Sequence, residues 1–393
     1  MEKDRQRRSI GTYAPPWWER FRFKLKRTLV DDNDSSYFGA IYELKDAHQS
    51  SNPLIMAADE EIFDVSGPLH LQNSLDWRNI YHRRSIAASL VHGVYVWEKD
   101  RQRRSFGHEH DTHAPPWWER FHFNLNHVLV DDNDLSCFGS IYELKYAHPY
   151  APKYVIAFRG TIKRFQTIFE DMKLNFKFVY GHPAESPRFH KAFDAVWNTV
   201  KMAGAANIWL AGHSLGASIA MLAGRKMAKC RFYLETYLFN PPFNSVPIEN
   251  LIKNPTLKHV VRVSGSLMKA GIATAMKGRS EDPEEDPFIM LSEWIPYVFV
   301  NPSDPICAEY IGYFQHRDKM VDIGMGGLER IAAKDSIVSL GSRAIGRELE
   351  PLHLLPTAYL TVNRSLSKGV KKAHKIHQWW QQDFEGTSKL YRF

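Results

Sequence analysis

Residues 207–220 place a single serine in a sharp turn between an apolar strand and a helix rich in small residues. The serine is Ser214, and Gly212 and Gly216 flank it in a Gly-x-Ser-x-Gly pattern. A serine hydroxyl attacks a carbonyl carbon only when the backbone presents it to a neighbouring base. The turn brings chain segments so close together that only small residues fit beside the serine. The pattern therefore predicts a serine nucleophile at the start of a helix.

A second apolar segment, residues 153–161, predicts another buried strand and ends in Arg159-Gly160-Thr161. Attack on an ester carbonyl creates a negatively charged oxygen, and hydrogen-bond donors must stabilise that charge. The first amides of a helix point toward such a charge, and the helix dipole favours it. The helix that follows Ser214 is therefore a candidate source of these donors.

Together, the Arg-Gly-Thr and Gly-His-Ser-Leu-Gly segments strongly resemble those of the class 3, or fungal-type, lipases of the α/β-hydrolase superfamily. The resemblance extends from about residue 62 to the C-terminal end. Segments such as residues 114–118 and 238–243 resemble a plant branch of that family, which carries the label GDSL esterase/lipase although this chain has no Gly-Asp-Ser-Leu block. The resemblance implies an α/β-hydrolase fold, and it implies that the backbone amides of Thr161 and Leu215 form the oxyanion hole.

In that superfamily the acid follows the nucleophile in sequence, and it is expected at the end of a strand on the same edge of the sheet. Residues 295–300 predict such a strand, and Asp304 follows it in a Pro-rich turn. The resemblance assigns Asp304 as the acid. Asp318 and Asp322 are the alternatives, and Asp304 could instead serve only as a cap of the turn.

The base is expected to be a histidine, because only the unperturbed pKa of histidine lies near neutrality. His353, His374 and His377 lie downstream of the predicted acid. His374 best matches the C-terminal pattern of the family, in which apolar and aromatic residues follow the histidine. We expect His377 on the same helical face about one turn later, which makes it the close second. His353 precedes the apparent last strand, residues 357–362, and is the third candidate.

Strands and helices alternate along the chain, which predicts an α/β fold with a mostly parallel central sheet and flanking helices. Apolar residues at helical spacing predict a helix over residues 85–97, covering the sheet edge, and another over residues 189–200. Residues 233–239 and 259–263 predict further strands. Two segments are candidates for a lid: residues 162–177 and an insertion between residues 265 and 294.

Composition and charge narrow the classes of function. The chain has 393 residues, 44% of them hydrophobic, which suffices for one large α/β domain. Its formal net charge of +7 is spread out, so we expect no nucleic-acid binding, although the charge is compatible with weak contact with an anionic membrane surface. Three widely spaced cysteines and an N-terminal segment without an apolar core predict a cytoplasmic protein without a signal peptide.

The chain also contains an internal repeat. Residues 14–48 recur as residues 114–148, with 26 of 35 positions identical. The second copy runs directly into the strand at residue 155, so its segment 138–145 is expected to pair with that strand as a hairpin. We therefore predict that residues 1–55 are a duplicated fragment outside the fold and that residues 56–393 form the hydrolase domain. A regulatory arm that competes with its own copy is the alternative.

These expectations combine into a serine carboxylic-ester hydrolase. Ser214 attacks an acyl carbonyl, His374 accepts its proton, and Asp304 orients the histidine. The expected substrate is an uncharged, acylglycerol-like lipid ester, since no head-group site is recognisable, and neither a metal nor a cofactor is expected. The alternative is a lipase-like scaffold that binds protein partners and for which hydrolysis is dispensable.

Overall fold

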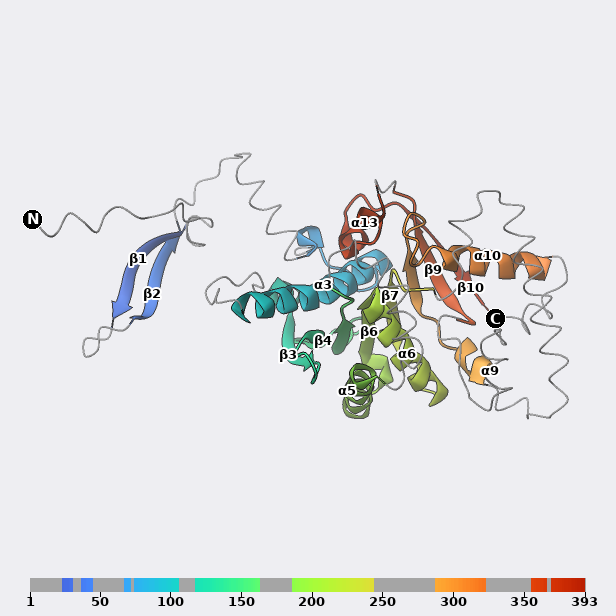
Figure 1. The fold of residues 1–393 in the computed structure, drawn as a ribbon, viewed down its shortest axis with the longest axis horizontal. Helices are drawn as coiled ribbons and strands as arrows, with labels where there is room; N and C mark the ends of the chain where they lie inside the picture. Colours follow the sequence, from blue (N-terminus) through green and yellow to red (C-terminus); the bar gives the residue numbers. More distant parts are fainter. Residues whose placement is uncertain are drawn as a thin grey trace, which may run out of the picture.

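The structure is a computed structural model that describes residues 23–30, 37–44, 67–71, 74–105, 117–162, 186–243, 287–322, 355–365 and 369–392. Within this part of the chain, the strands β3 to β10 form one sheet in the order β10-β9-β8-β7-β6-β5-β4-β3 (Figure 1). Its central strands are parallel: β5 (Tyr154–Phe158), β6 (Ile208–His213), β7 (Glu235–Phe239), β8 (Tyr297–Val300) and β9 (Ala358–Asn363).

The outer strands of this sheet are antiparallel to their neighbours. They are β3 (Phe123–Val130) and β4 (Cys137–Leu144) on one side and β10 (Gly386–Tyr391) on the other. The sheet is therefore mixed, and the expectation of a parallel arrangement holds for its centre only. This architecture fits an α/β-hydrolase-type fold.

Helices cover both faces of the sheet. Successive residues of a strand point to opposite faces, so neighbouring residues of one strand belong to different cores. On β5, Ile156 and Phe158 belong to a core that includes residues of α5 (Pro187–Ala203) and α6 (Leu215–Lys229). Val155 and Ala157 belong to the opposite core, which includes residues of α3 (Ile80–Ser105). The central strands are thus buried on both sides, as continuous apolar runs such as residues 154–158 require.

The helix α3 covers a face of the sheet and not its edge, which corrects the expectation for residues 85–97. It contacts β4, β5, β6 and β7 of the sheet (Figure 1), and it also contacts η6 (Ile376–Trp380), whose Trp379 packs on Phe239 and Phe299 of β7 and β8. Its residues 84–94 are all buried, since the helix packs against both the sheet and this C-terminal segment. The Nε atom of Arg84 donates to the carbonyl oxygen of Trp379 over 2.7 Å, which fixes η6 on the helix.

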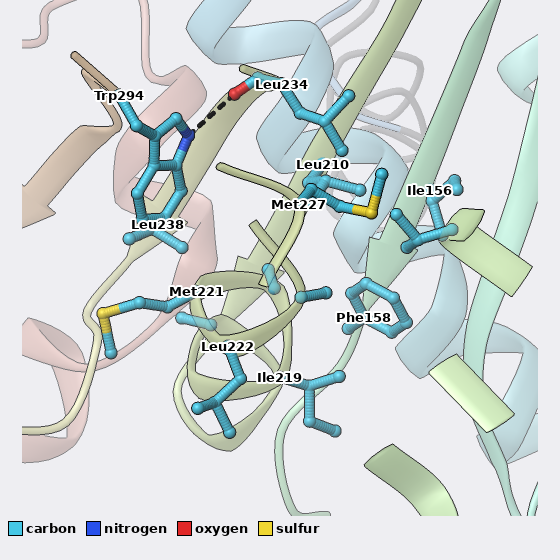
Figure 2. Close-up of a cluster of buried hydrophobic side chains, with 14 of the residues drawn as sticks. Ile156, Phe158, Leu210, Ile219, Met221, Leu222, Met227, Leu234, Leu238 and Trp294 are labelled. Carbon is cyan, nitrogen blue, oxygen red and sulfur yellow. Dashed lines mark hydrogen bonds between the residues drawn. The ribbon is translucent and has the colours of Figure 1, made fainter. Parts of the chain in front are cut away.

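Figure 2 shows part of the core beneath α6, where Phe158, Leu210 and Leu238 of the strands lie near Ile219 and Leu222 of the helix. The indole of Trp294 lies in the same core, and its Nε1 donates to the carbonyl oxygen of Leu234 over 2.9 Å. A Cβ atom at Gly224 would lie 2.4 Å from the ring of Trp294. The helix that follows the predicted nucleophile is thus packed tightly against Trp294 as well as against the sheet.

The two copies of the repeat form hairpins with the same register. The strands β1 (Phe23–Val30) and β2 (Tyr37–Leu44) make a separate two-stranded sheet, blue in Figure 1. Phe23 pairs with Leu44 as Phe123 pairs with Leu144, and the register shifts fall at equivalent positions. The strand β4 joins the main sheet by pairing antiparallel with β5, as expected for residues 138–145. The assignment of residues 1–55 to a fragment outside the fold stays a prediction.

The remaining elements are short or lie at the margins of the sheet. They are η1 (Leu69–Leu71), η2 (Trp117–Phe121), η4 (Ala205–Asn207), α9 (Pro287–Ser292), α10 (Glu309–Asp322) and α13 (Val370–Ala373). The predicted strand over residues 259–263 and most of both lid candidates (residues 163–177 and 265–286) lie outside the described residues. Among the described helices, none combines the length and the apolar character that crossing a bilayer demands.

Candidate active site

Ser214 stands between the last residue of β6 and the first residue of α6. Its backbone has φ 55° and ψ −126°, a conformation that costs a non-glycine residue about 1–3 kcal/mol. The N–H of Ser214 donates to the carbonyl oxygen of Phe239 at the end of β7 over 3.0 Å. The strained turn is therefore held by the neighbouring strand, and it presents the serine at the carboxyl edge of the parallel strands.

The glycines on either side of Ser214 permit this turn. A Cβ atom at Gly212 would lie 2.3 Å from the carbonyl oxygen of Gly216, and one at Gly216 would lie 2.3 Å from that of Phe158. Both contacts are to backbone, which cannot move aside as a flexible side chain can. The start of α6 consequently lies directly against the end of β5, where the Arg-Gly-Thr segment begins.

Arg159 fixes the direction of the peptide that follows Gly160. Its buried guanidinium donates through Nη1 to the carbonyl oxygen of Gly160 over 2.7 Å and through Nε to that of Cys137. In a planar trans peptide, the carbonyl and the N–H point in opposite directions. The N–H of Thr161 therefore points away from the guanidinium.

The second predicted donor, Leu215, is the first residue of α6. A helix cannot supply an acceptor for its own first N–H groups, and the helix dipole makes this end attractive to negative charge. Ser214 precedes Leu215 directly, and a Cβ atom at Gly160 would lie 2.8 Å from the Cβ of Ser214. Leu215 thus adjoins the serine in sequence, and Thr161 follows the glycine that packs against it.

Asp304 is fully buried in the turn after β8. Its Oδ2 accepts hydrogen bonds from Nδ1 of His374 over 2.8 Å and from Nδ2 of Asn240 over 2.6 Å. Its Oδ1 accepts from the backbone N–H of Ile306 over 3.1 Å. Buried carboxylates need such partners because desolvation penalises an uncompensated charge. The carboxylate is thereby fixed in one orientation toward the imidazole of His374.

Amide side chains hold the loop that carries His374. The carbonyl oxygen of Ala373 accepts from Nδ2 of Asn240 over 3.1 Å and from Nε2 of Gln378 over 2.7 Å. The Oε1 of Gln378 accepts from Asn301 over 2.7 Å and from Asn363 over 2.8 Å. Asn301 follows β8 and Asn363 ends β9, so the loop is tied to the ends of two neighbouring strands.

Asn240 and Gln378 are not predicted from the sequence. A usable signal exists for Asn240, because it follows β7 directly at the edge that also carries Ser214 and Asp304. Its backbone has φ 46°, a conformation that asparagine tolerates better than most residues. No local pattern indicates that Gln378 holds this loop, since Asn301, which donates to it, lies 77 positions earlier in the chain.

His213 links the nucleophile turn to the loop of His374. Its Nε2 lies 2.8 Å from the carbonyl oxygen of His374, and the two imidazole centroids are 4.9 Å apart. A carbonyl oxygen only accepts, so Nε2 of His213 carries the proton. Burial, together with the neighbouring His374, lowers the pKa of His213 well below its usual value. The ring is therefore neutral, and His374 lies beside the nucleophile turn.

His377 does not share a helical face with His374, which corrects that expectation. The helix α13 ends at Ala373, and Lys375 has an extended backbone (φ −68°, ψ 138°) before η6 begins. The His377 ring instead packs against the rings of His92 and Trp380, at centroid distances of 4.5 and 4.9 Å. The interruption at Lys375 thus turns the two histidines toward different neighbours.

Asp318 and Asp322, the two further candidates for the acid, belong to α10. Asp318 accepts from Nζ of Lys389 in β10, and Asp322 is the last residue of the helix. His353, the third candidate for the base, lies outside the described residues. The strand over residues 357–362 corresponds to β9 and is not the last, because the strand β10 follows it.

A scan of the chain against protein-family models finds no match. A search of curated proteins finds a protein of Arabidopsis thaliana named GDSL esterase/lipase At4g10955, which is 44% identical over 356 residues. The aligned region covers 86% of this chain and 100% of the relative.

Proposed function

Because the chain belongs to the same family of carboxylic-ester hydrolases as this Arabidopsis esterase/lipase, we propose that it cleaves esters through a triad of Ser214, His374 and Asp304. The observation that carries the proposal is the buried hydrogen bond between His374 Nδ1 and Asp304 Oδ2, 2.8 Å long. A carboxylate at Nδ1 fixes the tautomer of the imidazole and stabilises the imidazolium that forms when Nε2 takes a proton.

In the proposed reaction, the Oγ of Ser214 attacks the ester carbonyl and transfers its proton to Nε2 of His374. The carbonyl oxygen becomes an oxyanion, which the N–H groups of Thr161 and Leu215 stabilise. The intermediate then expels the alcohol, which takes the proton from His374, and leaves an acyl-serine. Water attacks the acyl-serine with His374 as the base, which releases the carboxylic acid and restores the hydroxyl.

We also propose that the enzyme is of the class 3 lipase type and that its substrate is an uncharged, acylglycerol-like lipid ester. The order of the Arg-Gly-Thr segment, the Gly-His-Ser-Leu-Gly segment, Asp304 and His374 supports the class. The name of the Arabidopsis relative, which includes the word lipase, supports a lipid ester.

A panel of esters tests the proposed substrate class. The purified protein and its Ser214→Ala variant are assayed on p-nitrophenyl esters of increasing chain length, monoacylglycerols and emulsified triacylglycerol. We expect the wild type to hydrolyse at least one acylglycerol and the variant to hydrolyse none. Turnover of short water-soluble esters alone would overturn the lipid assignment, and equal rates in both proteins would overturn the role of Ser214.

A further inference from the structure

Tyr95 of α3 contacts two of the segments that form the candidate active site. The backbone N–H of Gly160 donates to its Oη over 2.6 Å. The same Oη lies 2.8 Å from Nδ1 of His213, the residue that precedes Ser214. Gly160 belongs to the segment after β5, so one hydroxyl joins the oxyanion segment to the nucleophile turn.

The direction of each hydrogen bond in the series that links Gly160, Tyr95, His213 and His374 follows from the atoms that it joins. An N–H only donates, so Oη of Tyr95 accepts from Gly160. The hydroxyl proton of Tyr95 is then available to donate to His213. Nε2 of His213 donates to the carbonyl oxygen of His374 over 2.8 Å, so Nδ1 of the neutral ring accepts from Tyr95. A single ordered chain therefore runs from Gly160 through Tyr95 and His213 to the backbone of His374.

The packing around Gly160 leaves little room for movement. A Cβ atom there would lie 2.7 Å from Oη of Tyr95 and 2.8 Å from Cβ of Ser214. The tyrosine hydroxyl and the serine thus both lie against the same glycine. A shift of this segment changes the position of the following amide, Thr161, relative to the serine.

We propose that Tyr95 is a positioning residue that sets the oxyanion segment, the nucleophile turn and the loop of His374 relative to one another. The inference rests on the proposed function of Ser214, Asp304 and His374. Tyr95 does not act on the substrate itself. It acts through Gly160, whose next peptide carries the Thr161 N–H, and through His213, which holds the carbonyl of His374. A misplacement of about 1 Å in an active site can cost on the order of 100-fold in rate.

The substitution Tyr95→Phe tests this role. It removes only the hydroxyl and keeps the aromatic ring. The contact between the rings of residue 95 and His213, with centroids 5.7 Å apart, is kept as well. With a soluble substrate such as p-nitrophenyl butyrate, we expect kcat to fall by about 10- to 100-fold and KM to change little. We expect kcat to change more than KM because the surface that binds the substrate stays intact while the reacting groups are misplaced.

Tyr237→Phe is the matched control. Tyr237 is a fully buried tyrosine of the same domain, whereas Tyr95 is half-buried, and the hydroxyl of Tyr237 donates to Glu235 at the beginning of β7, the end of that strand remote from Ser214. Tyr237→Phe removes the same hydroxyl group as Tyr95→Phe, in each case from a partly buried hydrogen bond. We expect its kcat to equal that of the wild type, whatever the change in melting temperature.

A double mutant distinguishes one connected chain from two independent effects. If Tyr95 acts through His213, then Tyr95→Phe combined with His213→Ala should cost about as much in kcat as the worse single variant, because coupled groups are not additive. Effects that multiply fully would overturn a chain that runs through His213.

Ser214→Ala, measured in parallel, separates this inference from the proposed function. An inactive Ser214→Ala protein together with an unchanged kcat in Tyr95→Phe would overturn the role of Tyr95 alone. Full activity of Ser214→Ala would overturn the proposed function and this inference with it. A kcat loss in Tyr237→Phe equal to that in Tyr95→Phe would also overturn the positioning role of Tyr95, because the loss would then reflect general loosening of the core.

Discussion

The Nδ1 atom of His374 lies 2.8 Å from Oδ2 of Asp304, although 70 positions separate the two residues in the chain. The sheet topology explains the meeting. Asp304 follows β8, and the loop of His374 follows β9, the parallel neighbour of β8. The carboxyl ends of parallel strands lie at one edge, so loops that leave neighbouring strands meet there. Ser214 follows β6 at the same edge.

The acid and the base should both be indispensable if the proposed triad operates. We predict that Asp304→Asn and His374→Ala each lower kcat by several orders of magnitude, because triad members act as a unit. Matched controls are Asp318→Asn and His377→Ala, which change the same residue types elsewhere, and both should retain activity. A dead His377→Ala protein beside an active His374→Ala protein would move the base to His377.

Asn240 should matter for both stability and rate. Its Nδ2 holds Asp304, and its Oδ1 accepts from Nε1 of Trp379 over 2.7 Å. We predict that Asn240→Ala lowers the free energy of unfolding by about 2–4 kcal/mol, from an orphaned buried indole N–H and an alanine at positive φ. The measurement is denaturant unfolding, and kcat should fall at least tenfold.

Asn240→Gly separates the two effects of that change. Glycine adopts a positive φ without strain, yet it also lacks the amide that holds Asp304. We therefore expect the same loss of kcat as in Asn240→Ala. Normal kcat in Asn240→Gly would show that the backbone conformation matters and that the hydrogen bond to Asp304 does not.

His213 should make the fold sensitive to acid. Its pKa is lowered in the folded protein, by burial first and by His374 next, so below about pH 6.5 the unfolded chain binds a proton that the folded chain does not. Its contribution is complete above pH 6.5 and is lost as the pH falls toward the folded pKa, by up to about 1.4 kcal/mol per pH unit.

Melting temperatures between pH 5 and 8 test this sign. We predict that the wild type loses stability below about pH 6.5 and that His213→Gln loses less. Burial also lowers the pKa of His70 and His82, so the variant should flatten the profile without abolishing its slope. An identical slope in both proteins would contradict the buried neutral state of His213.

The two hairpins should differ in importance. The strand β4 pairs with β5, and a Cβ atom at Gly139 would lie 2.9 Å from the ring of Phe158, so the second copy is built into the sheet. We propose that the first copy is redundant. Removal of residues 1–55 should leave melting temperature and esterase activity nearly unchanged, whereas removal of residues 98–148 should prevent folding.

Size-exclusion chromatography examines a further consequence of the repeat. An extra copy of a strand-forming segment can exchange with the equivalent segment of another molecule. Full-length protein should therefore dimerise or aggregate more than the truncated form. Equal elution profiles would count against exchange, and a large loss of stability on truncation would show that residues 1–55 are not redundant.

The elements next to the nucleophile could be predicted because their signals are local. The strand, the turn and α6 follow from a few residues around Ser214, and the short apolar strand before Asp304 is an equally local signal. The edges of the sheet could not be predicted as well. The strand β10 has four exposed residues in succession, so it lacks the apolar alternation that marks a half-buried strand.

The choice of the base depends on contacts that local patterns do not reveal. Residues 370–377 contain no proline or glycine that would end a helix, and continuous helix would place His374 and His377 on one face. The helix instead ends at Ala373, where Gln378 donates to the carbonyl oxygens of Ala373 and Lys375, over 2.7 and 2.9 Å. Tyr95 is equally hidden, since it reaches the site from a helix far earlier in the chain.

The most direct test of the proposed triad is covalent labelling with a fluorophosphonate, followed by mass spectrometry of the proteolysed protein. Such probes react with a serine only when it is activated as a nucleophile. We predict one adduct, on the peptide that contains Ser214, with wild-type protein, and none with His374→Ala, in which the serine is intact but its base is absent. An unlabelled wild-type Ser214, or equal labelling of the two proteins, would contradict catalysis by Ser214, His374 and Asp304.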